Sequence, residues 1–235
     1  MPQWFRLDRP PVLAYLVLGL LGCHPNTPGL LPAGLRNVNA VDVAQWVGVT
    51  GPTGGALHRF TWLYQDEQSS KGGRGSARIA VPDSLRFDIA GSLGIGKGSA
   101  MVIGDSAQWV VPEGAVKDLI PDYELLWALF GIARRPPDGA TIAGLVEGQK
   151  TAWQYANGAD TVEYLRVSST PVTLAAEVRH AGKVIGRSLA TLHPDGSPAR
   201  ARLTVPSGPA KLEITFYATV PTPQFPPDTW RPPEP

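Results

Sequence analysis

The most motif-like group of residues is a glycine-rich segment at residues 91–99, Gly-Ser-Leu-Gly-Ile-Gly-Lys-Gly-Ser. The backbone amides of such a segment can point at a phosphate, and Lys97 would neutralise its charge. A phosphate-binding loop also needs Ser or Thr directly after the lysine to hold magnesium, and a helix after that. Here Gly98 follows the lysine, and the next residues have strand character. The segment therefore predicts a turn between strands, and nucleotide binding is not expected.

The remaining chemistry-bearing residues form no metal or nucleophile motif. The histidines, His24, His58, His180 and His193, lack metal-binding spacing, and the lone cysteine cannot complete a metal cluster with them. His193 lies in a predicted turn and His180 beside one, which favours solvent exposure. There is no Gly-x-Ser-x-Gly nucleophile elbow, although a Ser-His-Asp site assembled only in space stays open. We expect no enzyme activity, no metal and no cofactor.

The lone cysteine, Cys23, follows a leader-like segment. Residues 1–10 carry two arginines, and residues 12–21 carry no charge. This apolar run is shorter than the roughly 20 residues of a membrane-spanning helix and is typical of a secretory signal. Leu-Leu-Gly-Cys at residues 20–23 resembles the bacterial lipobox, whose cysteine is lipidated and becomes the first residue after cleavage. We predict a signal peptide at residues 1–22 and an acyl (palmitate) anchor on Cys23; the alternative is a core cysteine that follows an apolar run by chance.

The predicted mature chain carries no surplus charge. The whole sequence has a formal net charge of +1, and the leader removes Arg6, Asp8 and Arg9. A neutral chain argues against nucleic acid or another polyanion as a partner. In enteric bacteria an aspartate after the lipidated cysteine retains a lipoprotein in the inner membrane, so His24 at that position indicates the outer membrane, facing the periplasm.

Composition favours a β-rich domain. The 235 residues include 26 glycines and 24 prolines, and 17% are charged. Average proteins contain about 12% Gly plus Pro and about 25% charged residues. This excess of helix breakers excludes a helical bundle and indicates many turns between short strands. We predict a flexible tether at residues 23–36, a single domain at residues 37–220 and a Pro-rich tail at residues 221–235.

Alternating apolar residues predict a series of strands. Residues 58–65 place Phe60, Trp62 and Tyr64 on one face, and a polar, glycine-rich turn is expected to follow over residues 65–75. The clearest alternation joins three apolar residues, Leu85, Phe87 and Ile89, to two charged ones, Arg86 and Asp88. Further strands are expected at residues 76–81, 99–103, 108–111, 150–155, 161–167, 174–180, 183–192, 201–205 and 211–220.

Two segments have helical rather than strand spacing. Residues 38–49 are expected to form a short helix, capped by Asn39 or Asp42, that runs into a strand. Residues 121–131 begin with proline and end with glycine, as a helix does. Their apolar side chains share one helical face: Leu125, Leu126, Leu129 and Phe130. This helix must pack on the sheet.

The apolar side chains of the strands and the helix admit two interpretations. They form an ordinary packed core, or they line a cavity on the concave face of a curved sheet that the helix only partly fills. Periodicity does not distinguish these alternatives, because both place the same residues on one face.

The order of these features over about residues 45–220 is similar to that in the LolA/LolB-like lipoprotein-localisation family. After the lipobox come the strand at residues 85–89, Gly-Ser-Leu-Gly at residues 91–94, the helix around Leu125, and an Asp-Gly-Ser-Pro turn at residues 195–198. The resemblance implies an unclosed β-barrel whose apolar concave face is lidded by short helices. It also implies that the protein carries lipoprotein acyl chains or other lipids across the periplasm.

The resemblance also implies a membrane-contact loop. The lipidated member of that family exposes a leucine on a loop between two strands toward the bilayer; Leu93 matches this position, and Ile95 lies close by. Exposed apolar residues beside Lys97 suit a surface of anionic lipid. This chain departs from the family pattern at Gly96-Lys97-Gly98, which lengthens the loop. The alternative is that Leu93 folds back over the mouth of the barrel.

These observations predict a mainly β fold, a curved antiparallel sheet or unclosed β-barrel with a short helical lid. We predict a lipid-anchored, periplasm-facing carrier or receptor of the outer membrane that binds an acyl chain, a lipid or a lipoprotein without a covalent step. Its cavity residues would be Phe60, Trp62, Phe87, Ile89, Met101, Ile103, Leu126 and Phe130. The rival interpretation is a non-enzymatic scaffold or assembly lipoprotein with a solid core, whose Pro-rich tail binds a partner chain.

Overall fold

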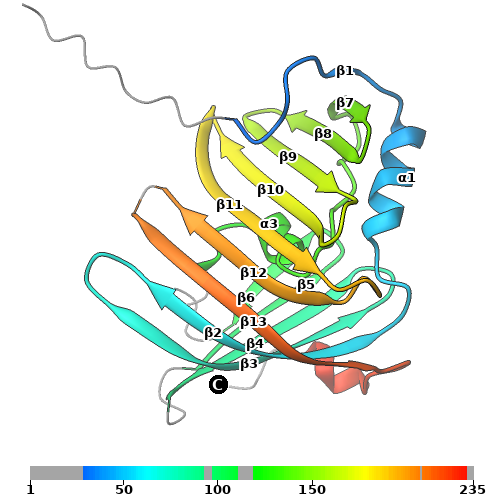
Figure 1. Ribbon diagram of the computed structural model, residues 1–235. Coiled ribbons are helices and arrows are strands. Elements are labelled where there is room, and N and C mark those ends of the chain that lie inside the picture. Colours follow the sequence, from blue (N-terminus) through cyan, green and yellow to red (C-terminus); the bar gives the residue numbers. More distant parts are fainter. Residues whose placement is uncertain (1–28, 93–96, 111–118, 207, 232–235) are drawn as a thin grey trace, which may run out of the picture.

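One curved antiparallel sheet of thirteen strands dominates the part of the chain that the computed structural model describes, residues 29–92, 97–110, 119–206 and 208–231 (Figure 1). The strands are β1 (Arg36–Asn37), β2 (Ala56–Gln65), β3 (Ser70–Ala80), β4 (Ser84–Gly91), β5 (Lys97–Ile103), β6 (Ser106–Val110), β7 (Thr141–Glu147), β8 (Lys150–Asn157), β9 (Asp160–Val167), β10 (Val172–His180), β11 (Lys183–Leu192), β12 (Pro198–Val205) and β13 (Ala210–Pro221).

The strand order is β1-β7-β8-β9-β10-β11-β12-β13-β2-β3-β4-β5-β6. The pairing of β13 with β2 joins the two halves of the chain, and β6 lies at the far edge from β1 and β7. The sheet is therefore not closed into a barrel, which confirms the predicted fold class.

The strands bury alternate residues as the sequence predicts. In β4, Leu85, Phe87 and Ile89 are buried on the concave face, whereas Arg86 and Asp88 lie partly exposed on the outer face. This pattern follows from the pleat, which points successive side chains to opposite faces of the sheet.

The glycine-rich stretch after β2 differs from its prediction. Only residues 66–69 form the turn, because β3 already begins at Ser70. The glycines lie inside β3, where neighbouring groups approach closely: a Cβ on Gly75 would lie 2.3 Å from the Phe60 ring, and one on Gly73 would lie 1.9 Å from the Ala90 carbonyl oxygen. Glycine within a strand thus marks close packing here, not a turn.

The first helix, α1 (Ala40–Thr50), is helical throughout, so the predicted change to a strand within residues 38–49 is wrong. The Asn39 side chain caps it by accepting a hydrogen bond of 2.8 Å from the Asp42 amide. Trp46 packs where a Cβ on Gly144 of β7 would stand, and its ring centroid lies 6.0 Å from that of Trp153. α1 therefore packs on the concave side of the sheet at β7 and β8.

The second described helix, α3 (Tyr123–Ala128), is shorter than the predicted span of residues 121–131. The Asp122 side chain caps it by accepting from the Glu124 amide at 2.8 Å, and Gly131, with a φ of 76°, turns the chain away after it. Every residue from Glu124 to Ala128 is buried. The helix packs on the sheet as predicted, but it lies inside the molecule, not on its surface.

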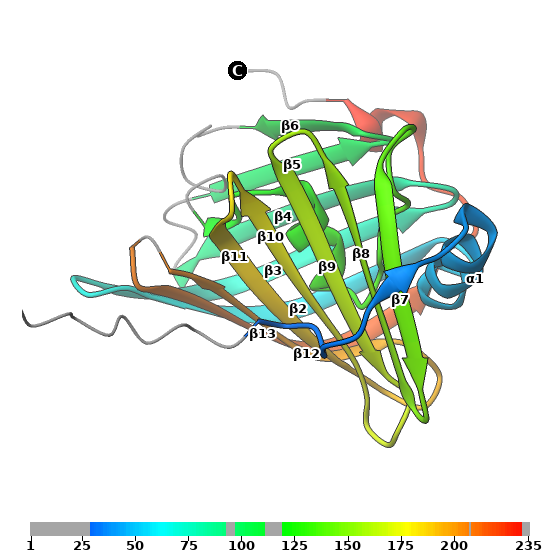
Figure 2. The same ribbon diagram turned by 90° about the horizontal axis from the view of Figure 1, so that it is seen from above.

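The two halves of the sheet, β7–β11 and β2–β6, face each other with α3 between them (Figure 2). A layer of phenylalanines from β2, β4 and β13 packs against Phe130, which follows α3. The ring centroids of Phe60 and Phe87 lie 5.2 Å apart, those of Phe60 and Phe216 5.6 Å, and those of Phe130 and Phe216 5.5 Å. Aromatic pairs at such distances add to the stability that burial provides. This aromatic layer forms the centre of the core.

Candidate ligand-binding site

A partly open pocket of about 460 Å³ lies at one end of the concave face. At this end β2, β10 and β12 begin and β3, β11 and β13 end. The link between α1 and β2, residues 51–55, forms one wall, and the turn between β11 and β12, residues 193–197, forms another. Its volume lies in the range of about 300–1,000 Å³ that is typical of small-molecule sites.

The inner part of the pocket is apolar. Phe130 and Ile132 come from the segment after α3, and Leu174 and Leu192 come from β10 and β11. Gly131 fits between these groups because it lacks a side chain: a Cβ there would lie 2.5 Å from a methyl carbon of Leu192. The aromatic layer closes the pocket on its inner side, since Phe130 belongs to both.

His58 is a buried polar residue of the pocket, and 5% of its surface is exposed. Its Nδ1 lies 3.0 Å from the hydroxyl oxygen of Thr219, and its ring lies 5.6 Å from that of Phe130. Burial lowers the pKa of His58 to about 4. The imidazole is therefore neutral at neutral pH and brings no positive charge to the pocket.

Arg166 is the arginine of the pocket wall. In the register of the sheet it pairs with Leu174, and it follows the buried residues Val162 and Tyr164 at every second position of β9, so it lies on the concave face. Its guanidinium donates to the Ser168 hydroxyl at 2.5 Å, and within the described residues it forms no ion pair with a carboxylate.

The other charged residue of the rim is Asp195 in the β11–β12 turn. Its carboxylate accepts hydrogen bonds from the Ser197 hydroxyl at 2.6 Å and from the Ser197 amide at 2.9 Å. These bonds lower the pKa of Asp195. They also hold the carboxylate against its own turn, which is exposed together with His193. The predicted exposure of His193 is thus confirmed, although the residue lies at the rim of a pocket.

Away from the pocket the concave face is filled. Leu125 packs against Gly186 of β11, where a Cβ would lie 2.5 Å from its methyl carbon. Glu124 is buried, and its charge would act on the nearby Tyr155 and Tyr164. Burial first, and then its hydrogen bond to Asp122, raise the pKa of Glu124 to about 9. The carboxyl group is therefore neutral at neutral pH, as expected for an acid enclosed in a packed interior.

The predicted cavity residues fall into two groups. Phe60, Trp62, Phe87, Ile89, Leu126 and Phe130 are buried members of the core, and among them Phe130 lines the pocket. The structure thus brings the six residues together, mostly as packing around α3.

Met101 and Ile103 do not belong with these residues. β5 pairs with β4 so that Met101 lies beside Arg86 and Ile103 beside Ser84, whereas Val102 and Ala100 lie beside Leu85 and Phe87. Both side chains therefore lie on the outer face, and the prediction that they line the concave cavity is wrong. Ile103 is 44% exposed there. Both residues are apolar in an almost unbroken apolar strand, so alternation gave no sign of which set faces inward.

Three predicted sites, Cys23, Leu93 and Ile95, lie outside the described residues. The strand residues next to the loop, Gly91 and Lys97, lie at the opposite end of the sheet from the pocket, because Gly91 pairs with Gly73 of β3, whereas the pocket contains Ile79.

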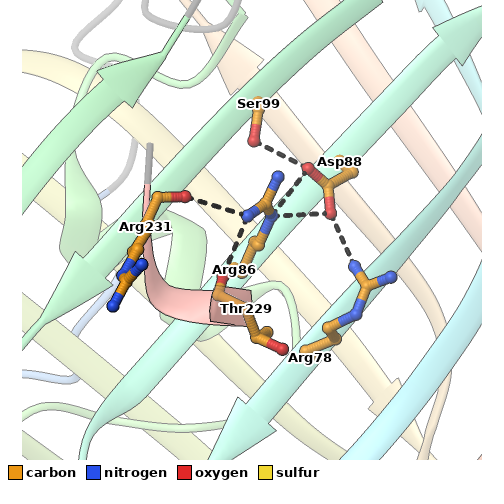
Figure 3. Close-up of polar contacts among 6 residues, drawn as sticks. All are labelled: Arg78, Arg86, Asp88, Ser99, Thr229 and Arg231. Atoms are coloured by element: carbon orange, nitrogen blue, oxygen red, sulfur yellow. Dashed lines mark hydrogen bonds and ion pairs between the residues drawn. The ribbon is translucent and has the colours of Figure 1, made fainter. Parts of the chain in front are cut away.

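The described part of the Pro-rich tail lies on the outer face of the sheet. β13 extends to Pro221, and Pro227–Trp230 form a short 3₁₀ helix, η2. Asp88 accepts hydrogen bonds from Arg78 at 2.7 Å, from Ser99 at 2.7 Å and from Arg86 Nε at 3.1 Å (Figure 3). The same Arg86 donates to the carbonyl oxygens of Thr229 at 2.9 Å and Arg231 at 3.2 Å. Asp88 thus orients an arginine that holds the tail against the body.

Comparison with known proteins identifies a fold. No known family model matches the sequence, and no curated protein matches it significantly. Among solved structures, the chain is similar to a candidate outer membrane lipoprotein-sorting domain from Vibrio parahaemolyticus, with a TM-score of 0.50 and 8% identity over 81% of this chain and 97% of that one. It is also similar to a DUF1329 family protein from Desulfovibrio piger, with a TM-score of 0.49 and 6% identity over 82% of this chain and 95% of that one. The fold is LolA/LolB-like.

The described residues contain neither a membrane-spanning helix nor a cluster of metal ligands. None of their helices is both long and apolar enough to cross a membrane. None of their His, Cys, Asp and Glu side chains gather in threes as metal ligands would.

Proposed function

We propose that this protein is a lipid-anchored carrier or receptor of the bacterial cell envelope, which binds an acyl chain of a lipid or lipoprotein in the pocket at the end of its concave face. The observation that carries the proposal is the partly open pocket of about 460 Å³ with its apolar inner part. The similarity of the fold to a lipoprotein-sorting domain supports it. Binding is reversible burial, with no covalent step and no cofactor.

The energetics require a preformed pocket. Apolar burial contributes roughly 25 cal/mol per Å², and affinity is lost when the site must first be ordered. Here the walls are tied to each other. The Thr50 hydroxyl accepts from the Ala133 amide at 2.9 Å, which joins α1 to the segment after α3. The Thr222 amide donates to the Gly55 carbonyl at 2.8 Å, which joins the α1–β2 link to the chain after β13.

The test is a titration of the delipidated protein with a fluorescent fatty acid. Saturable binding at one site is expected. Leu192→Trp should weaken that binding at least tenfold because the indole fills the pocket, whereas Leu189→Trp, on the exposed outer face of the same strand, should leave it unchanged. Circular dichroism establishes that both variants fold. Absence of saturable binding by the unchanged protein would overturn the proposal.

The anchor has its own test. Cys23→Ala should release the protein from membranes, because one lipidated residue supplies the attachment. Membrane association that persists in this variant would contradict lipidation at Cys23 and leave the pocket proposal untouched.

A second candidate function, a scaffold or assembly lipoprotein without cargo, is favoured by one observation. The concave face is packed solid around α3, where Leu125 and Leu126 are fully buried. For this candidate the titration gives no saturable binding with any acyl ligand.

A further inference from the structure

We propose that the pocket selects one single-chain amphiphile with an anionic head group, and that Arg166 is the residue that recognises this head group. The proposal rests on the acyl-binding function proposed above and narrows it to a class of ligand. Three observations carry the proposal: the size of the pocket, the packed interior beneath it, and the position of the Arg166 guanidinium at its wall.

Size limits the number of chains. The pocket volume of about 460 Å³ is near the lower end of the usual range for small-molecule sites. Beneath it, the stacked and edge-on rings of Phe60, Phe87, Phe130 and Phe216 close the way into the core. Further along, α3 occupies the concave face with every residue from Glu124 to Ala128 buried. A ligand with two or three acyl chains would have to displace this helix, whereas one chain would not.

Charge selects the head group. Arg166 stands on the concave face at the pocket wall, and its guanidinium donates to the neutral Ser168 hydroxyl. The planar guanidinium donates two parallel hydrogen bonds to a carboxylate or a phosphate, which a neutral head group does not match. The nearby carboxylate of Asp195 is already held by Ser197. His58 is neutral at neutral pH, so it neither repels nor attracts the head group.

The arrangement also sets the orientation of the ligand. Arg166 follows Tyr164 and Val162 along β9 toward the end of the strand, and the apolar side chains of Leu174, Phe130 and Ile132 lie in the same pocket. An anionic head on Arg166 therefore leaves the chain to lie across the apolar part.

The experiment compares head groups on one chain length. The purified protein is titrated with palmitate, with methyl palmitate, and with a single-palmitoyl lysophosphatidylglycerol, which separates a carboxylate from a phosphate. The variants are Arg166→Gln and, as a matched control, Arg59→Gln, whose side chain is exposed between the buried residues His58 and Phe60 of β2. Arg166→Gln should weaken the binding of palmitate about tenfold, since it removes charged hydrogen bonds. The same variant should leave the affinity for methyl palmitate unchanged. Arg59→Gln should change the affinity for neither ligand.

The outcomes distinguish a failure of head-group recognition from a failure of the acyl-binding function on which it rests. Equal affinities for palmitate and methyl palmitate, or equal effects of the two variants, would overturn head-group recognition by Arg166 while acyl binding stands. A preference for either anionic ligand over the ester that disappears in Arg166→Gln supports it, and the better of the two identifies the source of the anion. If no single-chain ligand binds the unchanged protein, the acyl-binding function itself fails.

Stoichiometry tests the size limit. Native mass spectrometry should show one palmitate per protein, and neither a diacyl phospholipid nor a triacyl lipopeptide should compete with it at equal concentration. Equal competition by the triacyl lipopeptide would overturn the restriction to one chain. A Leu192→Trp variant that loses palmitate in the same experiment would place the ligand in this pocket.

Discussion

The region around α3 and the pocket region share the concave face of one sheet but are filled to different degrees. In the first, Leu125, Leu126 and Trp127 are almost completely buried. In the second, Val172 and Leu192 are only half-buried beside a pocket. The same strands β10 and β11 reach both regions. What differs is the segment that crosses the concave face, because it presents large side chains in α3 and then Gly131. The pocket therefore opens where the large side chains of this segment end.

The first prediction contrasts a leucine from each region. Leu126→Ala should lower the free energy of unfolding by about 2–5 kcal/mol, because it leaves a cavity in a packed interior. Leu192→Ala should cost less than about 1.5 kcal/mol, because its site is already half open, yet it should weaken acyl binding. Urea unfolding and ligand titration of both variants measure these effects. Equal losses of stability would contradict the described difference in packing.

The second prediction concerns the buried histidine of the pocket. The unfolded pKa is 6.5 and the folded one is about 4, so protons bind the unfolded chain more readily between these values. His58 therefore favours folding above pH 6.5, and this contribution falls by about 3 kcal/mol as the pH drops to 4. In His58→Gln this part of the pH dependence should vanish, as chemical unfolding at pH 4, 5, 6 and 7 would show. His180→Gln is the control, since that ring is 64% exposed.

The third prediction concerns Glu124, the buried acid of the packed region. Its effect on the pH dependence of stability has the opposite sign to that of His58. Because the pKa of Glu124 is raised from 4.5 to about 9, the folded chain binds the proton more readily, and stability falls as the pH rises between these values. Glu124→Gln, which mimics the protonated form, should therefore be more stable than the unchanged protein at pH 8, with a smaller difference at pH 5. Thermal unfolding at the two pH values measures this. A variant less stable at pH 8 would show that Glu124 is ionised in the folded state.

The fourth prediction has the smallest expected effect. It concerns the outer face of the sheet, away from both regions. Arg86→Gln should free the tail at a cost of about 1 kcal/mol, since charged hydrogen bonds to Thr229 and Arg231 are lost from a partly exposed site. Arg78→Gln keeps those bonds and serves as the control. Faster hydrogen exchange in residues 222–231 of Arg86→Gln alone is expected. Equal exchange in the two variants would show that Arg86 does not hold the tail.

Much of the fold could be predicted from local patterns. Alternation in residues 85–89 correctly predicts the buried face of β4, and Asn39 is one of the two caps that the sequence predicts for α1. Prediction failed where one pattern permits two arrangements. In the sequence the glycines of β3 are typical of a turn, and only the Phe60 ring and the Ala90 carbonyl show that side chains are excluded there. The sequence patterns predict no element at residues 141–147, which form β7.

The site was less accessible to sequence analysis than the fold. The sequence predicts Phe130 as a cavity residue, whereas it identifies its pocket neighbours Leu174 and Leu192 only as strand residues. One signal was present: Arg166 stands in the alternation set of Val162 and Tyr164, which places a charged residue on an apolar face. Such an exception to the pattern marks a pocket or a strand end, and only the register of β9 with β10 shows that it lines this one.

The sequence by itself determined that this is a β-rich chain with a lipobox-like start, because turn residues, alternation and short motifs act over a few neighbouring positions. The tertiary structure alone decided that α3 lies inside the sheet, that Met101 faces outward, and that a pocket opens beside Gly131. These properties depend on strand register and on volume, which join residues more than a hundred positions apart, as His58 and Thr219 are. Local periodicity shows which residues share a face, but packing decides whether that face encloses a core or a ligand site.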